Sequence, residues 1–219
     1  MKKYLEILKK CSLFDGIVDE DLLPMLGCIR GIVKSYEKKE TVFAEGGEAS
    51  LVGIVLSGKV QIEKFDIDGN RSIVGTAEAS EMVGETFACA GVKKLPVNVV
   101  AAEKSEILLA DCKRIIYSCS NACDFHNKMI YNLLKTVAEK NIRFNKKLEI
   151  LSKRTTKEKL MAYLKMIAKE KGTKSFEISF DRKDLADYLQ VDRSGLSAEM
   201  SKLADEGVIA YRKNFFELL

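Results

Sequence analysis

The sequence has no apolar run long enough to span a membrane, and its N-terminus lacks the pattern of a secretory signal peptide. Tyr4 to Leu8 is only a short apolar patch between two lysine pairs. We therefore expect a chain that works in the cytoplasm. In that reducing compartment, the six cysteines are expected to be free thiols unless they hold a metal.

Histidine is nearly absent, since His126 is the single one in 219 residues. Jelly-roll enzymes of the cupin type hold metals with several His and carboxylate ligands inside the barrel, and His126 lies outside the strand-rich region. The sequence also has no Gly-x-Ser-x-Gly elbow and no phosphate-binding Gly-Lys-Ser/Thr loop. These absences argue against an enzyme.

The sequence does contain enough apolar material for packed cores, because 47% of its residues are hydrophobic. A length of 219 residues suits one large or two small domains. The net charge of +4 is unevenly distributed, with an acidic excess up to about residue 118 and a basic excess after it. Contacts with DNA are therefore expected toward the C-terminal end.

The segment 181–207 has the spacing of a helix-turn-helix. Asp181 is suited to cap a first helix and Asp192 a second, while Gly207 is suited to end the second. The second helix carries its apolar side chains on one face: Leu196, Met200 and Leu203. An ordinary helical hairpin would show similar apolar spacing and is the alternative.

The opposite face of the second helix is small and polar, which suits a helix that enters the DNA major groove. Residues 208–211 and 215–219 predict a β-hairpin with a basic tip, and together with the two helices it makes a winged helix. We predict DNA contacts from this face and this hairpin: Arg193, Ser194, Ser197, Ala198, Ser201, Lys202, Arg212 and Lys213.

The N-terminal part changes from helical to extended spacing near Gly31. Residues 1–30 are expected to form helices that lie as a lid over the strands after them. Asp68 and Gly69 form the clearest hairpin turn. Short strands at turn-marked intervals predict an antiparallel barrel or jelly roll. They are expected at residues 32–33, 41–44, 51–56, 60–65, 72–76, 97–102 and 106–110.

Residues 119–151 contain the sharpest periodicity in the chain. Seam positions recur at alternating intervals of four and three residues: Ile130, Leu134, Val137, Asn141, Phe144, Leu148 and Leu151. This heptad pattern predicts a dimerisation helix, in which an Asn at the seam favours one register. The alternative is a long amphipathic helix packed on its own barrel.

Residues 152–180 connect this helix to the helix-turn-helix. A capping box of Thr155 with Glu158 predicts a further helix that ends at Gly172. Phe176, Ile178 and Phe180 alternate as a short strand.

The order of roll, long helix and winged helix-turn-helix resembles the CAP/FNR (Crp/Fnr) family of bacterial transcription regulators. Five short motifs carry the resemblance: Leu56-Ser57-Gly58-Lys59-Val60, Asp68-Gly69-Asn70-Arg71, Gly84-Glu85, Asp192-Arg193-Ser194 and Glu206-Gly207-Val208-Ile209. The resemblance implies an α+β fold with a β-roll resembling a cyclic-nucleotide-binding domain. It further implies a homodimer that binds double-stranded DNA at a roughly palindromic operator and contacts RNA polymerase.

The resemblance implies that the chain has three parts, and that Arg193 contacts a base. Residues 1–118 are the effector or sensor domain, 119–151 the dimerisation helix and 152–219 the DNA-binding domain. Arg193 matches an Arg near the start of the family's recognition helix and is the best candidate for a guanine contact. Ser194 stands where many members have Glu, and Ala198 where many have a second Arg. The operator is therefore expected to differ from theirs.

The effector is a separate question. Family members that bind cyclic AMP carry, after the Gly-Glu pair, an Arg-Ser or Arg-Thr that holds the cyclic phosphate. This sequence keeps Gly84 and Glu85, but it has Leu95-Pro96 before Val97 and so lacks the bidentate donor. Cyclic-nucleotide binding is therefore disfavoured. The roll is expected to hold either another small ligand or none, and a ligand would lie near four residues: Gly84, Glu85, Pro96 and Val97.

A thiol cluster before the long helix offers a competing sensor. Cys119, Cys123 and His126 are spaced to share one helical face and are soft enough for zinc, copper or iron. The tight N-terminal cysteine group of iron–sulfur relatives is not present. The alternative is that these side chains are small buried hydrophobes. A third hypothesis is a non-catalytic ligand-binding scaffold that has lost specific DNA recognition.

Overall fold

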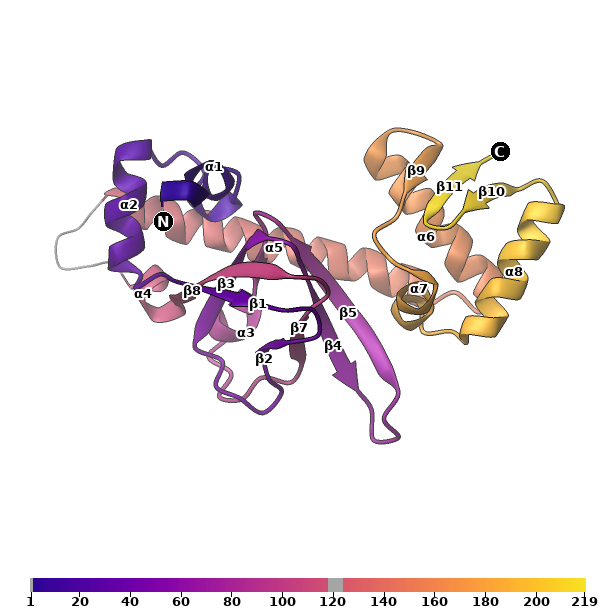
Figure 1. Ribbon diagram of the computed structural model, residues 1–219, viewed down its shortest axis with the longest axis horizontal. Helices are drawn as coiled ribbons and strands as arrows, with labels where there is room; N and C mark the ends of the chain where they lie inside the picture. Colours follow the sequence, from indigo (N-terminus) through magenta and orange to yellow (C-terminus); the bar gives the residue numbers. More distant parts are fainter. Residues whose placement is uncertain (1, 118–123) are drawn as a thin grey trace. The chain divides into compact units, whose positions relative to one another are not determined.

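The computed structural model describes residues 2–117 and 124–219 (Figure 1). The chain divides into two compact units, each with its own core. The N-terminal unit comprises residues 1–69 and 74–141, and the C-terminal unit residues 70–73 and 142–219. None of the helices in the described parts of the chain is both long and apolar enough to cross a membrane.

The N-terminal unit is built on two four-stranded sheets, as expected for a jelly roll. Their strand orders are β1-β8-β3-β6 and β2-β7-β4-β5, and the pairs β1–β8, β3–β8 and β4–β7 are antiparallel. The strands are β1 (Ile32–Tyr36), β2 (Thr41–Phe43), β3 (Leu51–Ser57), β4 (Lys59–Phe65), β5 (Arg71–Glu78), β6 (Met82–Val83), β7 (Asn98–Ala101) and β8 (Ser105–Asp111). All seven predicted strands overlap an observed one, and β6 was not predicted.

An apolar core fills the space between the two sheets and includes Phe43, Val55, Val99 and Ile107. Gly84 leaves β6 with a φ of 83°, in the left-handed region. A Cβ at this position would lie 2.9 Å from the Phe43 ring. The backbone of Gly84 therefore approaches the core more closely than any other residue type permits.

Short helices complete the N-terminal unit: η1 (Lys2–Tyr4), α1 (Leu5–Leu8), η2 (Ser12–Phe14), α2 (Asp19–Cys28), α3 (Glu85–Cys89) and α4 (Cys112–Ile116). Helices η1, α1, η2 and α2 pack against β3, β8 and part of α5. Together they form a second apolar core, which includes Leu22, Val52, Leu108 and Met129. The prediction that residues 1–30 contain helices is confirmed. Helices α3 and α4 were not predicted, because five residues are too few to show a helical period.

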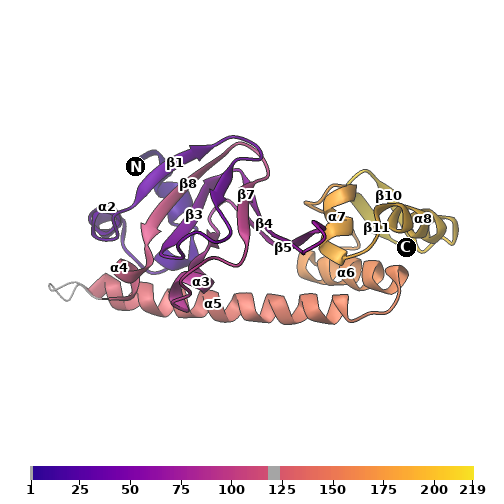
Figure 2. The ribbon, with the colours of Figure 1, turned by 90° about the horizontal axis from the view of Figure 1, so that it is seen from below.

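Helix α5 (Asp124–Leu151) is one continuous helix of 28 residues, and Figure 2 shows α3 beside it. Its first part packs on the N-terminal unit through a buried polar face as well as apolar side chains. The Asn132 side-chain amide donates to the carbonyl oxygens of Leu13, at 3.1 Å, and Asp15, at 2.9 Å. The Thr136 hydroxyl lies 2.8 Å from the hydroxyl of Ser12. One face of α5 is therefore fixed by the chain itself.

The C-terminal unit contains α6 (Thr156–Lys171), β9 (Ser175–Glu177), α7 (Arg182–Leu189), α8 (Arg193–Asp205), β10 (Ile209–Arg212) and β11 (Phe215–Leu218). Its sheet is antiparallel, in the order β10-β11-β9. The predicted capping box of Thr155 and Glu158 is confirmed, and α6 ends at Gly172 with a φ of 65°. The predicted strand through Phe180 is too long, because β9 ends at Glu177 and Phe180 is buried outside it.

Asn70 and the first residues of β5 belong to the C-terminal unit. Ile73 joins its apolar core. The Arg71 guanidinium lies 2.9 Å from a carboxylate oxygen of Asp184 and 2.8 Å from one of Asp187, both on α7. These contacts explain why residues 70–73 group with the helix-turn-helix, which the sequence did not indicate.

Candidate nucleic-acid interface

The two helices of the helix-turn-helix are set by their caps. The Asp181 carboxylate accepts a hydrogen bond from the Asp184 backbone N–H at 2.8 Å, and the Asp192 carboxylate accepts one from Gly195 at 2.8 Å. Gln190 makes the turn between them in a left-handed conformation, with a φ of 53°. Hydrogen bonds from the Ser194 hydroxyl and the Gly195 N–H lower the pKa of Asp192, so this cap stays ionised. The predicted caps are confirmed.

Helix α8 has one buried and one exposed face. Its apolar residues Leu196, Met200 and Leu203 are fully buried, as predicted. The opposite face exposes most of the predicted DNA-contacting side chains: Arg193, Ser194, Ala198, Ser201 and Lys202. Ser197 is half-buried, and its hydroxyl donates to the Arg193 carbonyl oxygen at 3.0 Å. Within the described C-terminal unit, α8 therefore exposes a row of small and basic side chains.

The β10–β11 hairpin forms a wing beside α8. Lys213 has a φ of 54° in the turn, and both Arg212 and Lys213 are exposed, so the predicted basic tip is confirmed. The Tyr211 hydroxyl lies 3.5 Å from the Ser201 hydroxyl, which links the wing to the exposed face of α8. Helix and wing thus share one surface.

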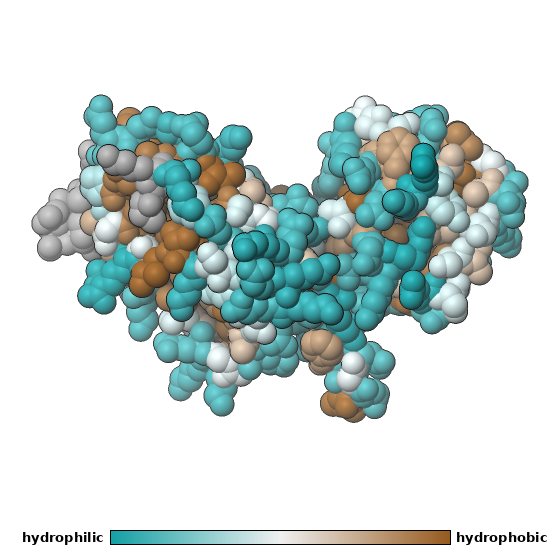
Figure 3. All heavy atoms as spheres, in the orientation of Figure 1, coloured by the Kyte–Doolittle hydropathy of each residue, from teal (hydrophilic) through white to brown (hydrophobic). Residues whose placement is uncertain are grey.

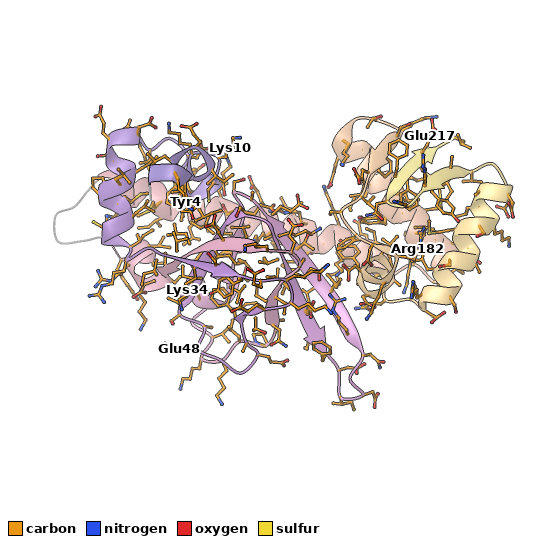
Figure 4. All side chains as sticks on the ribbon, viewed as in Figure 1. Tyr4, Lys10, Lys34, Glu48, Arg182 and Glu217 are labelled. Atoms are coloured by element: carbon orange, nitrogen blue, oxygen red, sulfur yellow. The ribbon has the colours of Figure 1, made fainter. Side chains whose placement is uncertain are left out.

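Arg182 belongs to the same surface, although it was not among the predicted contacts. It is the first residue of α7, and its guanidinium lies 5.2 Å from the centroid of the Tyr211 ring and against the Met200 sulfur (Figure 4). Burial and the positive charge of Arg193 lower the pKa of Arg182, while Tyr211 opposes this shift. Its partners Met200 and Tyr211 lie on other elements, so no local pattern in the sequence identifies it.

The residues predicted to surround an effector are divided by the structure. Gly84 and Glu85 lie at the junction of β6 with α3, and Val97 is buried, whereas Pro96 is exposed. The buried Glu85 carboxylate forms an ion pair with Lys140 of α5, with its Oε1 atom 2.6 Å from Nζ. Lys140 also donates to the Met82 carbonyl oxygen at 2.6 Å. The chain itself therefore supplies a cation to Glu85.

The heptad seam of α5 is largely open to solvent in the single chain. The large apolar residues Leu134, Phe144 and Leu148 are 67%, 41% and 64% exposed, and Asn141 is exposed between them. The other three seam residues are half-buried: Ile130, Val137 and Leu151. Hydrophilic residues cover much of the face seen in Figure 3, with separate apolar patches between them. Leu134 and Leu148 are mainly exposed, so they do not fit the alternative in which the seam packs on the chain's own barrel.

The predicted thiol cluster falls mostly outside the described residues, because Cys119 and Cys123 are not among them. His126 is described and is 2% exposed. Its ring stacks on Phe125 with the centroids 4.9 Å apart, and its Nδ1 atom has no hydrogen-bond partner in the described structure. Within residues 2–117 and 124–219 no group of three or more His, Cys, Asp or Glu side chains is placed to hold a metal.

Comparison with known families gives two matches in the order of the two units. Residues 33–116 match the family model described as a cyclic nucleotide-binding domain. Residues 158–219 match the one described as a Crp-like helix-turn-helix domain. The roll and the winged helix-turn-helix are thus each recognised separately.

Two curated relatives are transcriptional activators. The chain is 25% identical over 173 residues to a probable transcriptional activator of Rhizobium leguminosarum bv. viciae, covering 77% of this chain and 69% of that protein. It is 24% identical over 186 residues to the transcriptional activator protein FnrL of Cereibacter sphaeroides, covering 81% and 72%.

Solved structures share the fold at lower identity. The c-di-GMP-responsive global regulator CLP of Xanthomonas campestris has a TM-score of 0.73 and 18% identity, with 90% of this chain and 98% of that chain covered. FixK2 of Bradyrhizobium japonicum has a TM-score of 0.68 and 18% identity, with 86% and 92% covered. Both extend over most of each chain, so the order of roll, long helix and helix-turn-helix is common to all three.

Proposed function

Because the chain belongs to the Crp/Fnr family of DNA-binding transcription regulators, we propose that it acts as a homodimer on a roughly palindromic operator. The observation that carries this proposal is the exposed face of α8 beside the basic wing. Arg193 and Ser201 lie on that face, with Arg212 and Lys213 on the wing. A helix that exposes short donors and one Arg at its N-terminal end matches the shape and the hydrogen-bonding groups of a major groove.

The dimer is supported by the exposed seam of α5. Leu134 and Leu148 lie fourteen residues apart, at equivalent heptad positions, and both are mainly exposed. A second copy of α5 would bury them and pair Asn141 with its symmetry mate. Two-fold symmetry would then present two copies of α8 to two half-sites of opposite orientation, which is why a palindromic operator is expected.

Control of DNA binding is assigned to the β-roll, with an effector other than cyclic AMP. Two features support this choice: Leu95-Pro96 offers no bidentate phosphate donor, and Glu85 is already paired with Lys140. Contact with RNA polymerase follows from the family alone. Control by a metal or thiols at Cys119, Cys123 and His126 is kept as a hypothesis, since two of its three residues lie outside the described part of the chain.

Selection of genomic fragments bound by the purified protein tests the DNA-binding proposal. The selection is run with and without oxygen, and the metal content of the same sample is measured. We expect enrichment of an inverted repeat. Arg193→Ala should weaken this enrichment and relax the preference at one base pair in each half-site, whereas Lys34→Ala, at an exposed lysine of the roll, should retain it. Salt-sensitive binding without any enriched sequence would support the scaffold hypothesis instead. The absence of an enriched sequence under every condition would refute the proposed operator.

A further inference from the structure

Two thiols that are distant in sequence meet in the N-terminal unit. Cys89 is the last residue of α3, and Cys112 is the first residue of α4. Their sulfur atoms are 3.6 Å apart, and both cysteines are free. The pair lies outside both surfaces assigned to DNA and to the second copy. Its separation of 23 residues gave no signal in the sequence.

The two thiols differ in exposure and in acidity. Cys89 is half-buried, whereas Cys112 is 2% exposed. A hydrogen bond from the Cys112 thiol lowers the pKa of Cys89. The same contact, together with burial, raises the pKa of Cys112. Cys89 is thus the more exposed and more acidic thiol, and the buried Cys112 sulfur lies in contact with it.

We propose that Cys89 and Cys112 form a redox modification site, at which a hydroperoxide converts the two thiols into an intramolecular disulfide. Closing an S–S bond of about 2.05 Å requires the two sulfurs, now 3.6 Å apart, to approach by roughly 1.5 Å. A half-buried cysteine with a lowered pKa, in contact with a second thiol, is an arrangement that favours sulfenic acid formation followed by disulfide closure.

The reaction balances in two steps. The Cys89 sulfur attacks one oxygen of the hydroperoxide, the O–O bond breaks, and the departing alkoxide takes the Cys89 proton and leaves as an alcohol. Cys89 is then a sulfenic acid. The Cys112 sulfur attacks the Cys89 sulfur, the S–OH bond breaks, and hydroxide takes the Cys112 proton and leaves as water. The two sulfurs give up two electrons, and the O–O bond is reduced by them.

The bond would join the end of α3 to the start of α4. Helix α3 begins with Glu85, which pairs with Lys140 of α5. Oxidation would therefore restrain the helix that carries this ion pair. Cys11 is a poor competitor for the oxidant, because it is 1% exposed and burial raises its pKa to about 12.

Trypsin digestion makes the test specific, because the two cysteines fall in different peptides. Cys89 lies in peptide 72–93 and Cys112 in peptide 105–113, whereas Cys119 and Cys123 share peptide 115–128. The reduced full-length protein is treated with hydrogen peroxide, its remaining thiols are alkylated, and the digest is analysed by mass spectrometry. We expect a disulfide between peptides 72–93 and 105–113 that a dithiol reductant reverses.

Three variants complete the experiment. In Cys112→Ser, Cys89 is expected to stop at the sulfenic acid, which a dimedone probe traps, or to proceed to sulfinic acid. In Cys89→Ser, we expect at least tenfold slower loss of the Cys112 thiol, because Cys112 is buried. Cys28→Ser, in which a half-buried thiol elsewhere is removed, is expected to oxidise like the unmodified chain. The proposal is overturned if peptides 72–93 and 105–113 remain alkylated while other thiols oxidise, or if Cys89 links to a different cysteine.

Discussion

Lys140 of α5 reaches the Glu85 carboxylate at the start of α3, with Nζ 2.6 Å from Oε1. The Glu85 side chain is 1% exposed, and its Oε2 atom has no hydrogen-bond partner in the described structure. The long helix therefore supplies a cation to this buried carboxylate. The ion pair therefore connects α5 with the helix that follows the roll's sixth strand.

Replacing this lysine should be costly to the fold. Lys140→Met leaves the Glu85 carboxylate buried without its cation, and we expect the free energy of unfolding to fall by about 3–5 kcal/mol. The double variant Lys140→Met with Glu85→Gln should recover a large part of this loss, because no charge is then buried. Urea denaturation of all three proteins measures the effect. A loss below about 1 kcal/mol in the single variant would contradict a stabilising role for the pair.

Lys147 predicts a pH dependence of stability in the C-terminal unit. It is 8% exposed, its Nζ donates to the Ile73 carbonyl oxygen, and it lies 4.0 Å from the centroid of the Tyr188 ring. Burial lowers the pKa of Lys147 to about 8, whereas a lysine in an unfolded chain has a pKa of about 10.4. Below pH 8, Lys147 is protonated in both the folded and the unfolded chain, and the folded chain is destabilised by the buried ammonium.

Between about pH 8 and pH 10 the folded chain binds fewer protons than the unfolded chain, so the free energy of unfolding rises with pH. Over this pH range, the free energy of unfolding of the unmodified chain should rise by roughly 2 kcal/mol relative to that of Lys147→Met. Urea denaturation at each pH measures it. Lys146→Met is the matched control, since Lys146 is 45% exposed and pairs with Glu170 at the surface. Parallel pH curves for the unmodified chain and Lys147→Met would show that the buried ammonium does not titrate in this range.

The extent of prediction from sequence differs between the two units. Caps and periodic helices were correctly predicted in the C-terminal unit, because Asp181, Asp192 and Thr155 each cap through a residue three positions away. The roll was predicted as a fold class, but α3 and α4 were missed. Their positions depend on packing between distant segments, which a local pattern does not encode.

The contacts that were not predicted from the sequence are mainly those between residues far apart in the chain. The ion pair of Arg71 with Asp184 joins residues 113 positions apart, and the Glu85–Lys140 pair is likewise remote in sequence. Charged residues of this kind are indistinguishable from solvated surface residues until the fold brings them together. Arg182 was missed for the same reason, since its partners Met200 and Tyr211 lie on other elements.

The seam of α5 gives a direct test of the homodimer. Leu134→Glu with Leu148→Glu places charges at two mainly exposed seam positions, and we expect a folded monomer, because four carboxylates would meet across the interface. Light scattering after size-exclusion chromatography measures the mass, and circular dichroism confirms folding. Lys135→Glu, at an exposed position outside the seam, should stay dimeric. A dimer that persists in the double variant would place the interface elsewhere.

Arg193 and Lys213 should contribute to DNA binding in different ways. Arg193 lies at the exposed N-terminal end of α8, where a bidentate contact with guanine is worth about 1–3 kcal/mol of base discrimination. Arg193→Ala should therefore weaken binding to the selected operator and relax its preference at one base pair in each half-site. Lys213 lies in the wing turn, where its ammonium is expected to meet phosphate.

Lys213→Ala should accordingly weaken binding by a similar factor on every sequence, and reduce the slope of log K against log salt concentration by about one per half-site. Fluorescence anisotropy with the operator and with a scrambled duplex, each at several salt concentrations, separates the two effects. Arg193→Lys adds a control, since it keeps the charge and removes the planar fork. If Arg193→Lys retained full base preference, charge alone would account for the role of Arg193, and specificity would have to come from DNA shape or from other residues of α8.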